Sequence, residues 1–217
     1  LKKTTTMKKA TTFQKSCIAI ILFFGIALNS VFAQTPLFTQ NFNSSSTLSN
    51  YINSSSPNNG QFNAITTSSG MTASITGSAL QFVRTSGTGS FSRTTNFSPI
   101  PSGIIYKFDL NVTASSQTGT VARWQVGDGF GTNNSNESSN DCFAQFAIDF
   151  RTGNNYRIND ITNGNTSSNF SGGTVRTITW VLNNSGSTLS YNAPDGTVKT
   201  VSNNRTDLWV GNTRVIT

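Results

Sequence analysis

The 217-residue sequence contains no histidine and only two cysteines. Without histidine, the Ser-His-Asp and Cys-His catalytic arrangements are excluded, because both use an imidazole as the general base. The common zinc sites combine several His or Cys ligands, so they are excluded as well. Cys142 opens the apolar segment 142–146, where we expect an inert, half-buried thiol.

Acidic residues are also scarce, with eight Asp and Glu against fifteen Lys and Arg. Five of the cationic residues are lysines that precede residue 34. The remainder of the chain therefore carries ten cations and eight acids, a net charge of +2. Nucleic-acid binding normally requires clustered Lys and Arg, and the chain after residue 34 has only scattered ones. We predict no nucleic-acid partner.

The first 33 residues have the three parts of an export signal. Lysines between residues 8 and 15 come first, an apolar run follows at 17–28, and a small-x-small motif at 31–33 precedes Gln34. A membrane span needs about 20 apolar residues, and this run is shorter. We therefore predict translation from Met7, cleavage before Gln34, a secreted or cell-surface protein, and no membrane span after cleavage.

Cysteine placement bears on the same segment. Cys17 stands at the start of the apolar run, whereas a lipidated cysteine follows such a run, so a lipoprotein anchor is disfavoured. Cleavage removes Cys17 and leaves Cys142 without a partner for an internal disulfide.

After residue 34, short segments rich in β-branched and aromatic residues alternate with Asn-Gly, Asp-Gly and Ser-Gly turn signals. This pattern predicts a single all-β domain over 34–217, built as a two-sheet antiparallel sandwich. The expected strands are 37–42, 61–66, 72–76, 79–84, 89–97, 104–113, 119–126, 142–151, 155–161, 174–183, 187–192, 197–202 and 206–210.

Three central segments place apolar and polar residues on opposite faces. In 104–112, 122–126 and 142–151, every second residue is apolar. We therefore expect each strand to bury one row and to present the other row to solvent. Trp124 and Trp180 share rows with aliphatic residues, so we expect them in the core.

Several segments carry a family resemblance. They are Asn41-Phe42-Asn43, Ala79-Leu80-Gln81-Phe82 with Ile105-Tyr106-Lys107-Phe108-Asp109, and the hairpin from Thr177-Ile178-Thr179-Trp180 to Pro194-Asp195-Gly196. From residue 37 to about 210 the chain resembles concanavalin A-like lectin/glucanase jelly rolls, including laminin-G-like modules. Such domains are found at the N-terminus of secreted multidomain bacterial proteins. The resemblance implies a jelly roll, a fold that hosts lectins, glycosidases and spacers alike.

The end of the chain also suggests a larger protein. Residues 213–217 begin what looks like a further strand, and the sequence stops there. In jelly rolls the last strands commonly pair near the first. We therefore expect a C-terminally truncated domain, a fragment of a longer polypeptide.

Glucanases of this fold place two or three carboxylates on one strand as Glu-x-Asp-x-x-Glu. The corresponding strand here, 143–151, offers only Asp149, and the single glutamate, Glu137, lies in a polar loop. A retaining glycosidase needs two carboxyl groups about 5–5.5 Å apart. Pairing of Asp109 with Asp149 stays open as a catalytic alternative, but we predict a non-catalytic domain.

A binding interpretation uses the polar row of the central strands, which we expect to be adjacent. Amide, guanidinium and carboxylate groups on one sheet face offer sugar hydroxyls both donors and acceptors. The alternative is a solvated face with cross-strand charge pairs, such as Asp109 with Arg123. The candidate carbohydrate-binding residues are Asp109, Arg123, Gln125, Gln145 and Asp149.

The loop that follows residue 126 offers two weaker signals. Its glycines at 127–131 resemble a phosphate-binding loop, but no helix follows to complete one. Its oxygen-bearing side chains make a structural calcium ion possible, although their spacing is not that of an EF-hand. The weak calcium candidates are Asp128, Asn133, Asn136, Glu137 and Asp141.

Together these patterns predict a secreted, lectin-like module that binds carbohydrate or acts in cell-surface interaction and spacing. No other cofactor is expected. Two alternatives stay open: an accessory domain of a polysaccharide-degrading enzyme of glycoside hydrolase or pectate lyase type, and a calcium-dependent adhesin.

Overall fold

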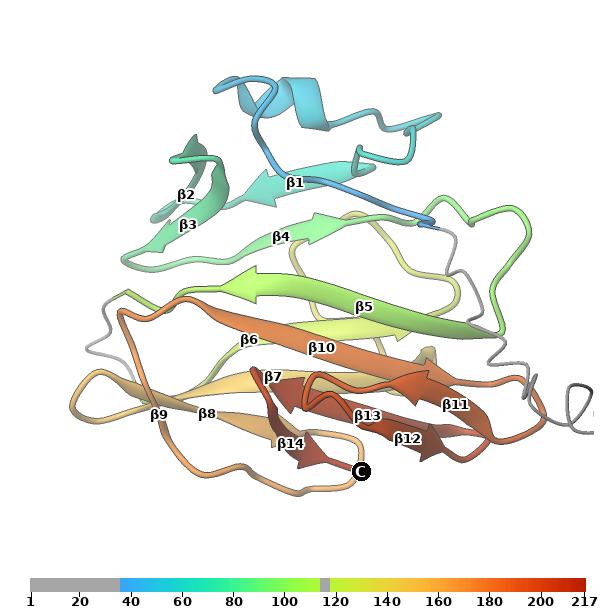
Figure 1. The fold of residues 1–217 in the computed structure, drawn as a ribbon. Helices are drawn as coiled ribbons and strands as arrows, with labels where there is room; N and C mark the ends of the chain where they lie inside the picture. The colour runs from blue at the N-terminus through green and yellow to red at the C-terminus, as the bar shows by residue number, and fades with distance from the viewer. Residues whose placement is uncertain (1–35, 114–117) are drawn as a thin grey trace, which may run out of the picture. The chain divides into compact units, whose positions relative to one another are not determined.

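The computed structural model describes residues 36–113 and 118–217, and within them the chain is all-β, as predicted (Figure 1). Residues Leu37–Thr217 form one compact unit. No helix in the described ranges has the length and apolar character to cross a membrane. The elements are η1 (Leu48–Tyr51), β1 (Ala64–Thr67), β2 (Met71–Thr76), β3 (Ala79–Arg84), β4 (Gly89–Ser92), β5 (Gly103–Leu110), β6 (Gly119–Gly127), β7 (Cys142–Arg151), β8 (Asn155–Asp160), β9 (Phe170–Ser171), β10 (Arg176–Asn183), β11 (Leu189–Asn192), β12 (Val198–Val201), β13 (Arg205–Val210) and β14 (Thr213–Ile216).

Two four-stranded antiparallel sheets build the main body. We call the sheet with strand order β14-β13-β10-β5 the front sheet and the sheet with order β6-β7-β8-β9 the back sheet, as they lie in Figure 1. Short turns join β7 to β8 and β13 to β14, and their positive-φ positions are occupied by Gly153 and Asn154 in the first turn and by Gly211 in the second. The result is a sandwich-like arrangement of antiparallel sheets.

The core lies between the two sheets, where alternate residues of each strand meet. Trp180 of β10 is 2% exposed and packs edge-on against Phe146 of β7, with ring centroids 4.9 Å apart. Trp124 of β6 stacks between Phe108 and Phe146 at 5.3 Å from each. The predicted core positions of Trp124 and Trp180 are therefore confirmed.

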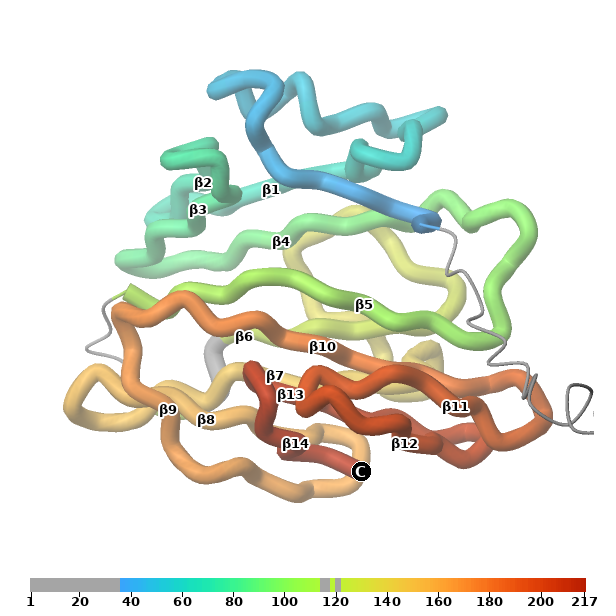
Figure 2. Tube along the Cα trace, in the orientation of Figure 1, coloured from blue at the N-terminus to red at the C-terminus, as the bar shows by residue number. Residues whose placement is uncertain are grey.

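The hairpin β11–β12 covers the outer face of the front sheet (Figures 1 and 2). Tyr191 and Val201 of the hairpin pack there against Val181 and Trp209. Strand β10 is thus buried on both faces, which explains its nearly continuous apolar sequence. The hairpin adds a third layer at this point of the fold.

Residues 37–97 form a smaller packed region above β5 in Figure 1, built from the pairs β1–β4 and β2–β3. Aromatic rings connect this region to the core. Phe62 packs against Phe91 at 5.5 Å, and Phe91 contacts Trp124 at 6.4 Å. The apolar interior therefore continues from the N-terminal region into the sandwich.

Most predicted strands are confirmed, and β7 spans 142–151 as expected. The expected strand 37–42 is wrong, because Gln40 and Asn41 accept hydrogen bonds from backbone N–H groups two residues on and turn the chain. Strand β4 ends at Ser92 instead of residue 97, and the two-residue strand β9 was missed. Residues 213–216 form β14 at one edge of the front sheet.

Candidate functional site

Four of the five predicted carbohydrate-binding residues lie together on the outer face of the back sheet. Strand β6 contributes Arg123 and Gln125, and β7 contributes Gln145 and Asp149. Gln125 stands opposite Gln145 in the antiparallel register, and Arg123 stands opposite Ala147. The neighbouring positions Trp124 and Phe146 face the core, so these polar residues face away from it.

Asp109 does not belong to this group. Its strand, β5, pairs with β10 in the front sheet, and Thr177 Oγ1 donates a hydrogen bond to Asp109 Oδ1 at 2.7 Å. Since Phe108 points into the core, Asp109 lies on the opposite outer face. The expected adjacency of Asp109 and Arg123 is therefore wrong, and so is a catalytic pair of Asp109 with Asp149. The two-residue period assigns a side chain to a face, but it does not say in which sheet the strand lies.

The two glutamines are fixed by the loop 128–141. Gln125 Nε2 donates to Gln145 Oε1 at 3.3 Å and to the Glu137 carbonyl at 3.1 Å. The Glu137 N–H donates in return to Gln125 Oε1, and Gln145 Nε2 donates to Ser139 Oγ. Gln145 is only 7% exposed, so the expectation of a fully solvated row is wrong at this position.

Asp149 is likewise buried, at 4% exposure, and two arginines surround its carboxylate. Arg157 of β8 stands opposite Asp149 and its Nε lies 2.6 Å from Oδ2. Arg151 Nη1 lies 3.6 Å from the same oxygen. Arg123 is exposed and makes no ion pair within the described residues. We call the outer face formed by Arg123, Gln125, Gln145, Ala147, Asp149, Arg151, Arg157 and Asn159 the polar face.

Three of the calcium candidates accept hydrogen bonds from backbone N–H groups of their own loop. Gly129 N–H donates to Asp128 Oδ1, Gly131 N–H donates to Glu137 Oε1, and Ser135 N–H donates to the side-chain oxygen of Asn133. These are local side-chain-to-backbone turns, which short polar residues favour. In the part of the chain that the structure describes, no three acidic, His or Cys residues come together as a metal site.

The thiol of Cys142 lies at the same end of the polar face. Gln125 Nε2 lies 3.2 Å from its Sγ, and the residue is half-buried, as predicted. Burial raises the pKa of the Cys142 thiol, which keeps it protonated and unreactive at neutral pH.

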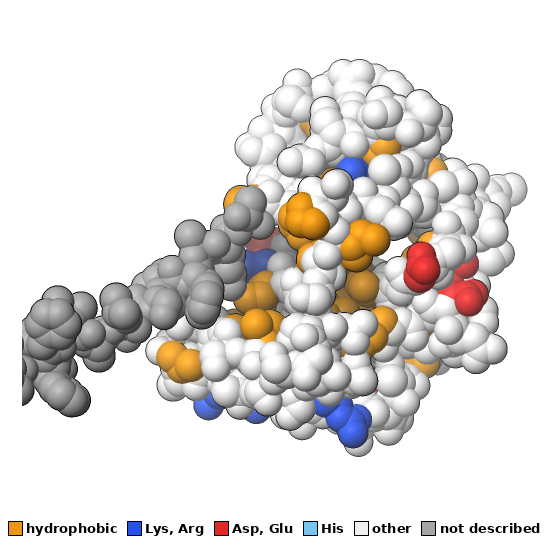
Figure 3. All heavy atoms as spheres, turned by 90° about the vertical axis from the view of Figure 1, so that its right-hand side faces the viewer, with side chains coloured by type: hydrophobic (Ala, Val, Ile, Leu, Met, Phe, Trp, Pro, Cys, Tyr) orange, Lys and Arg blue, Asp and Glu red, His pale blue; other side chains and the backbone are white. Residues whose placement is uncertain are grey.

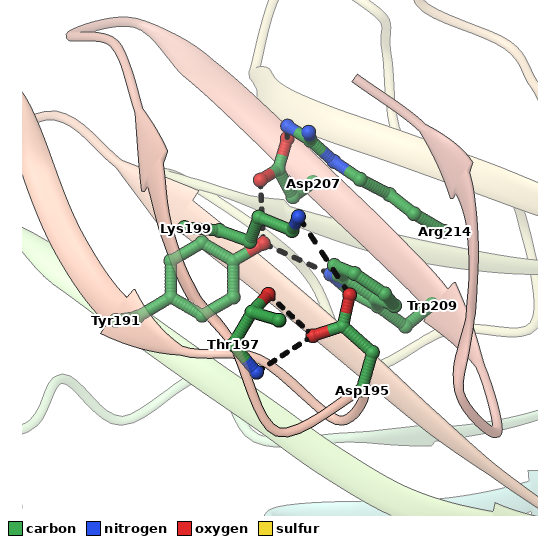
Figure 4. Close-up of polar contacts among 7 residues, drawn as sticks. All are labelled: Tyr191, Asp195, Thr197, Lys199, Asp207, Trp209 and Arg214. Atoms are coloured by element: carbon green, nitrogen blue, oxygen red, sulfur yellow. Dashed lines mark hydrogen bonds and ion pairs between the residues drawn. The ribbon is translucent and has the colours of Figure 1, made fainter.

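A second polar cluster was missed in the sequence and lies under the hairpin β11–β12 (Figure 4). Tyr191 donates to Asp207 Oδ2 at 2.6 Å, and Trp209 Nε1 donates to the Tyr191 hydroxyl at 2.9 Å. Asp207 is 1% exposed and forms an ion pair with Arg214. Burial, followed by the hydrogen bond to Asp207, raises the pKa of Tyr191 to about 12. This network fastens the hairpin to the front sheet.

Two further features border this cluster. At the hairpin turn, Thr197 donates to Asp195 through both its hydroxyl and its N–H, and these bonds lower the pKa of the Asp195 carboxyl (Figure 4). Beside Asp207 an open pocket of about 240 Å³ is lined by Thr200, Val201, Ser202, Arg205, Asp207, Arg214 and Thr217. In the sequence, the cluster of Tyr191, Asp207 and Trp209 has one signal: Asp207 and Trp209 are two residues apart on β13 and therefore lie on the same face of the strand.

The fold and the polar face define the chain as an all-β, sandwich-like domain whose back sheet presents ordered amide and guanidinium groups. No family model, no curated protein and no solved structure matches the chain. The residues of the polar face therefore provide the basis for a functional proposal.

Proposed function

We propose that the chain is a secreted, non-catalytic jelly-roll module that binds carbohydrate through the polar face. The observation that carries this proposal is the position of the exposed Arg123 and the half-buried Asn159, which stand on either side of β7 next to the Gln125–Gln145 pair that the loop 128–141 holds in place. Gln125 and Gln145 already hydrogen-bond to each other and to that loop, so they order the face without contacting a ligand. The guanidinium of Arg123 supplies donors to sugar hydroxyls, and the amide of Asn159 supplies donors and an acceptor.

The placement of hydrogen-bonding groups across three neighbouring strands agrees with an extended ligand. Ala147 of β7 lies between Arg123 of β6 and Asn159 of β8 in the register. Ala147 is 0% exposed because other atoms cover it, so at this position the accessible hydrogen-bonding groups lie on β6 and β8. A sugar chain laid across the strands would contact the flanking guanidinium and amide groups together.

The arrangement of carboxylates supports a non-catalytic role. On the polar face β7 carries one carboxylate, Asp149, and both Arg157 and Arg151 engage it. Glu137 accepts a backbone hydrogen bond in its own loop. Glycoside hydrolysis by two carboxylates needs a second such group about 5–10 Å from the first, on the same face. The binding module would also suit an accessory domain of a polysaccharide-degrading enzyme.

Retention on a glycan array tests the proposal, with the chain from Gln34 as the probe. Asn159→Ala removes an amide from the polar face, and Asn111→Ala removes an exposed amide just beyond β5 as its matched control. We expect Asn159→Ala to weaken retention by about fivefold, or about 1 kcal/mol, at an unchanged melting temperature, and Asn111→Ala to have no effect.

Two results would contradict the proposal. If the unmodified chain retains no glycan, the domain is not a carbohydrate-binding module. If it releases reducing ends from a retained polysaccharide, and Asp149→Asn abolishes that release, the domain is an enzyme.

A further inference from the structure

We infer that the ligand of the polar face is an acidic polysaccharide, one that carries carboxylate groups along its chain. This inference rests on the proposed carbohydrate-binding function and adds the chemical class of the glycan. The observation behind it is the distribution of charge, which is uneven over the described residues.

The polar face holds three arginines, Arg123, Arg151 and Arg157, and one acid, Asp149, a net charge of +2. All eight acids of the sequence, and the ten cations that follow residue 34, lie in the described residues. Away from the polar face the remaining seven cations and seven acids therefore cancel. The entire net charge of the described chain is located on this one sheet face.

The charges elsewhere do not neutralise the face. Asp195 pairs with Lys199 and Asp207 pairs with Arg214, both at the front sheet and its hairpin. In the view of Figure 3, acidic side chains gather at one place on the surface, and most of the visible lysine and arginine side chains lie elsewhere.

Asp128, Glu137 and Asp141 lie in or beside the loop that contacts Gln125 and Gln145, at one end of the polar face. Arg157 and Arg151 lie four and six residues further along β7 in register, about 13 and 20 Å from Gln145 by the usual rise. Exposed charges interact weakly beyond about 10 Å at moderate salt, so these loop acids do not offset those two arginines.

Asp149 orients two of the guanidinium groups without using them fully. Arg157 contacts Asp149 through Nε, which leaves both Nη groups out of that bond, and the Arg157 side chain is 29% exposed. Arg151 is 44% exposed and meets the same oxygen at the longer distance of 3.6 Å. Guanidinium groups bind carboxylates through two parallel N–H···O bonds, a geometry that lysine cannot supply.

The spacing of the arginines favours a polymer over a small anion. Arg123 and Arg157 lie on the two strands that flank β7, two residues apart in register. From the usual strand spacing and rise, their Cα atoms are about 12 Å apart. A single small carboxylate cannot bridge that distance, whereas successive acidic sugars of an extended chain can contact each guanidinium in turn. The amide of Asn159 is then available for the neutral hydroxyls.

The test compares acidic polysaccharides with an uncharged polysaccharide and with a polyanion that is not a polysaccharide. Polygalacturonate and alginate are the acidic probes, methyl-esterified polygalacturonate is the uncharged match, and single-stranded DNA is a polyanion of a different class. Arg123→Gln removes one charge from the polar face. Lys107→Gln, on the exposed outer side of β5, removes one charge from the front sheet and is the matched control.

We expect at least one acidic probe to bind about tenfold more tightly than the methyl ester and the DNA. Arg123→Gln should weaken that binding about fivefold, while Lys107→Gln should leave it within about twofold. Added salt should weaken binding of the acidic probe and leave any binding of the ester unchanged. Thermal melts confirm that both variants stay folded.

Three outcomes would overturn the inference of an acidic ligand, and only the last would also reject carbohydrate binding. Equal retention of the ester and the acidic probes, or retention of neutral glycans alone, rejects the acidic class but leaves carbohydrate binding standing. DNA retained as tightly as the acidic probes shows a polyanion site without preference for sugars. If the chain retains none of these polymers and no glycan on the array, the proposed function fails together with the inference.

Discussion

Tyr191→Phe is the change whose effect follows most directly from the structure. The substitution keeps the ring, so the packing against Val201 and Trp209 is preserved and no cavity forms. It removes the hydroxyl that donates to Asp207 Oδ2 at 2.6 Å and accepts from Trp209 Nε1 at 2.9 Å. One buried carboxylate and one buried indole N–H then each lose a partner.

The expected loss in the free energy of unfolding follows from these two hydrogen bonds. A hydrogen bond to a charged group contributes about 1.5–3 kcal/mol, and an unsatisfied buried donor costs about 1–3 kcal/mol. Because Arg214 still pairs with Asp207, we expect a loss near the lower end of the sum, about 3 kcal/mol in the free energy of unfolding. For a domain of this size that corresponds to a fall of about 6–12 °C in melting temperature.

The same hydroxyl makes stability depend on alkaline pH. The pKa of Tyr191 in the folded protein is about 12, above its ordinary value of 10, so the unfolded chain releases this proton first as the pH rises. The contribution is fully present below pH 10 and is lost as the pH passes through about 12. In Tyr191→Phe this part of the alkaline decline should disappear. A remaining decline is expected from Tyr106, whose pKa burial also raises to about 12.

Urea denaturation at neutral pH and across the alkaline range measures both effects, with Tyr106→Phe as a control that removes a hydroxyl from the other cluster. A Tyr191→Phe variant within about 0.5 kcal/mol of the unmodified chain would refute the view that this hydroxyl fastens the hairpin. An alkaline decline identical in both proteins would refute the assignment of the raised pKa.

Two further predictions concern the core and the N-terminus. Trp180→Ala should lower the free energy of unfolding by about 3–5 kcal/mol, because the ring is 2% exposed and packs against Phe146. Arg123→Ala, at an exposed position of the polar face, should change it by no more than about 0.5 kcal/mol. A Trp180→Ala variant as stable as the parent would contradict the placement of Trp180 in the core. Mass spectrometry of exported protein should find Gln34 at the N-terminus, since the basic, apolar and small-x-small segments precede it, and an exported chain that begins upstream of Asn29 would reject the export signal.

The composition of the polar face could be predicted because strand residues alternate between faces. The pattern around Trp124 and Phe146 identified Arg123, Gln125, Gln145 and Asp149 as residues that point away from the core, and the structure places them on one outer face. Their burial could not be predicted. It depends on the loop 128–141, which folds back over Gln125 and Gln145, and on the pairing of β8 beside β7, which brings Arg157 onto Asp149.

The second polar cluster shows the same limit. The local sequence of β13 does not indicate that the hairpin of residues 189–201 covers this strand. The burial of Asp207 therefore becomes apparent only when Tyr191 and Val201 are placed above it in the structure. The error at residues 37–42 has a different cause. Its Phe and Thr content suggested a strand, but the side chains of Gln40 and Asn41 compete for the backbone and turn the chain.

The all-β class, most of the strands, the inward rows that contain Trp124 and Trp180, and the exclusion of histidine chemistry could be read from the sequence, because these depend on residue type and on a period of two along the chain. Which strands are neighbours depends on the tertiary structure. It separates Asp109 from Asp149, places Arg157 beside Asp149, and gathers three arginines with one acid on the polar face, because contacts between strands distant in sequence are fixed by how the sheets assemble.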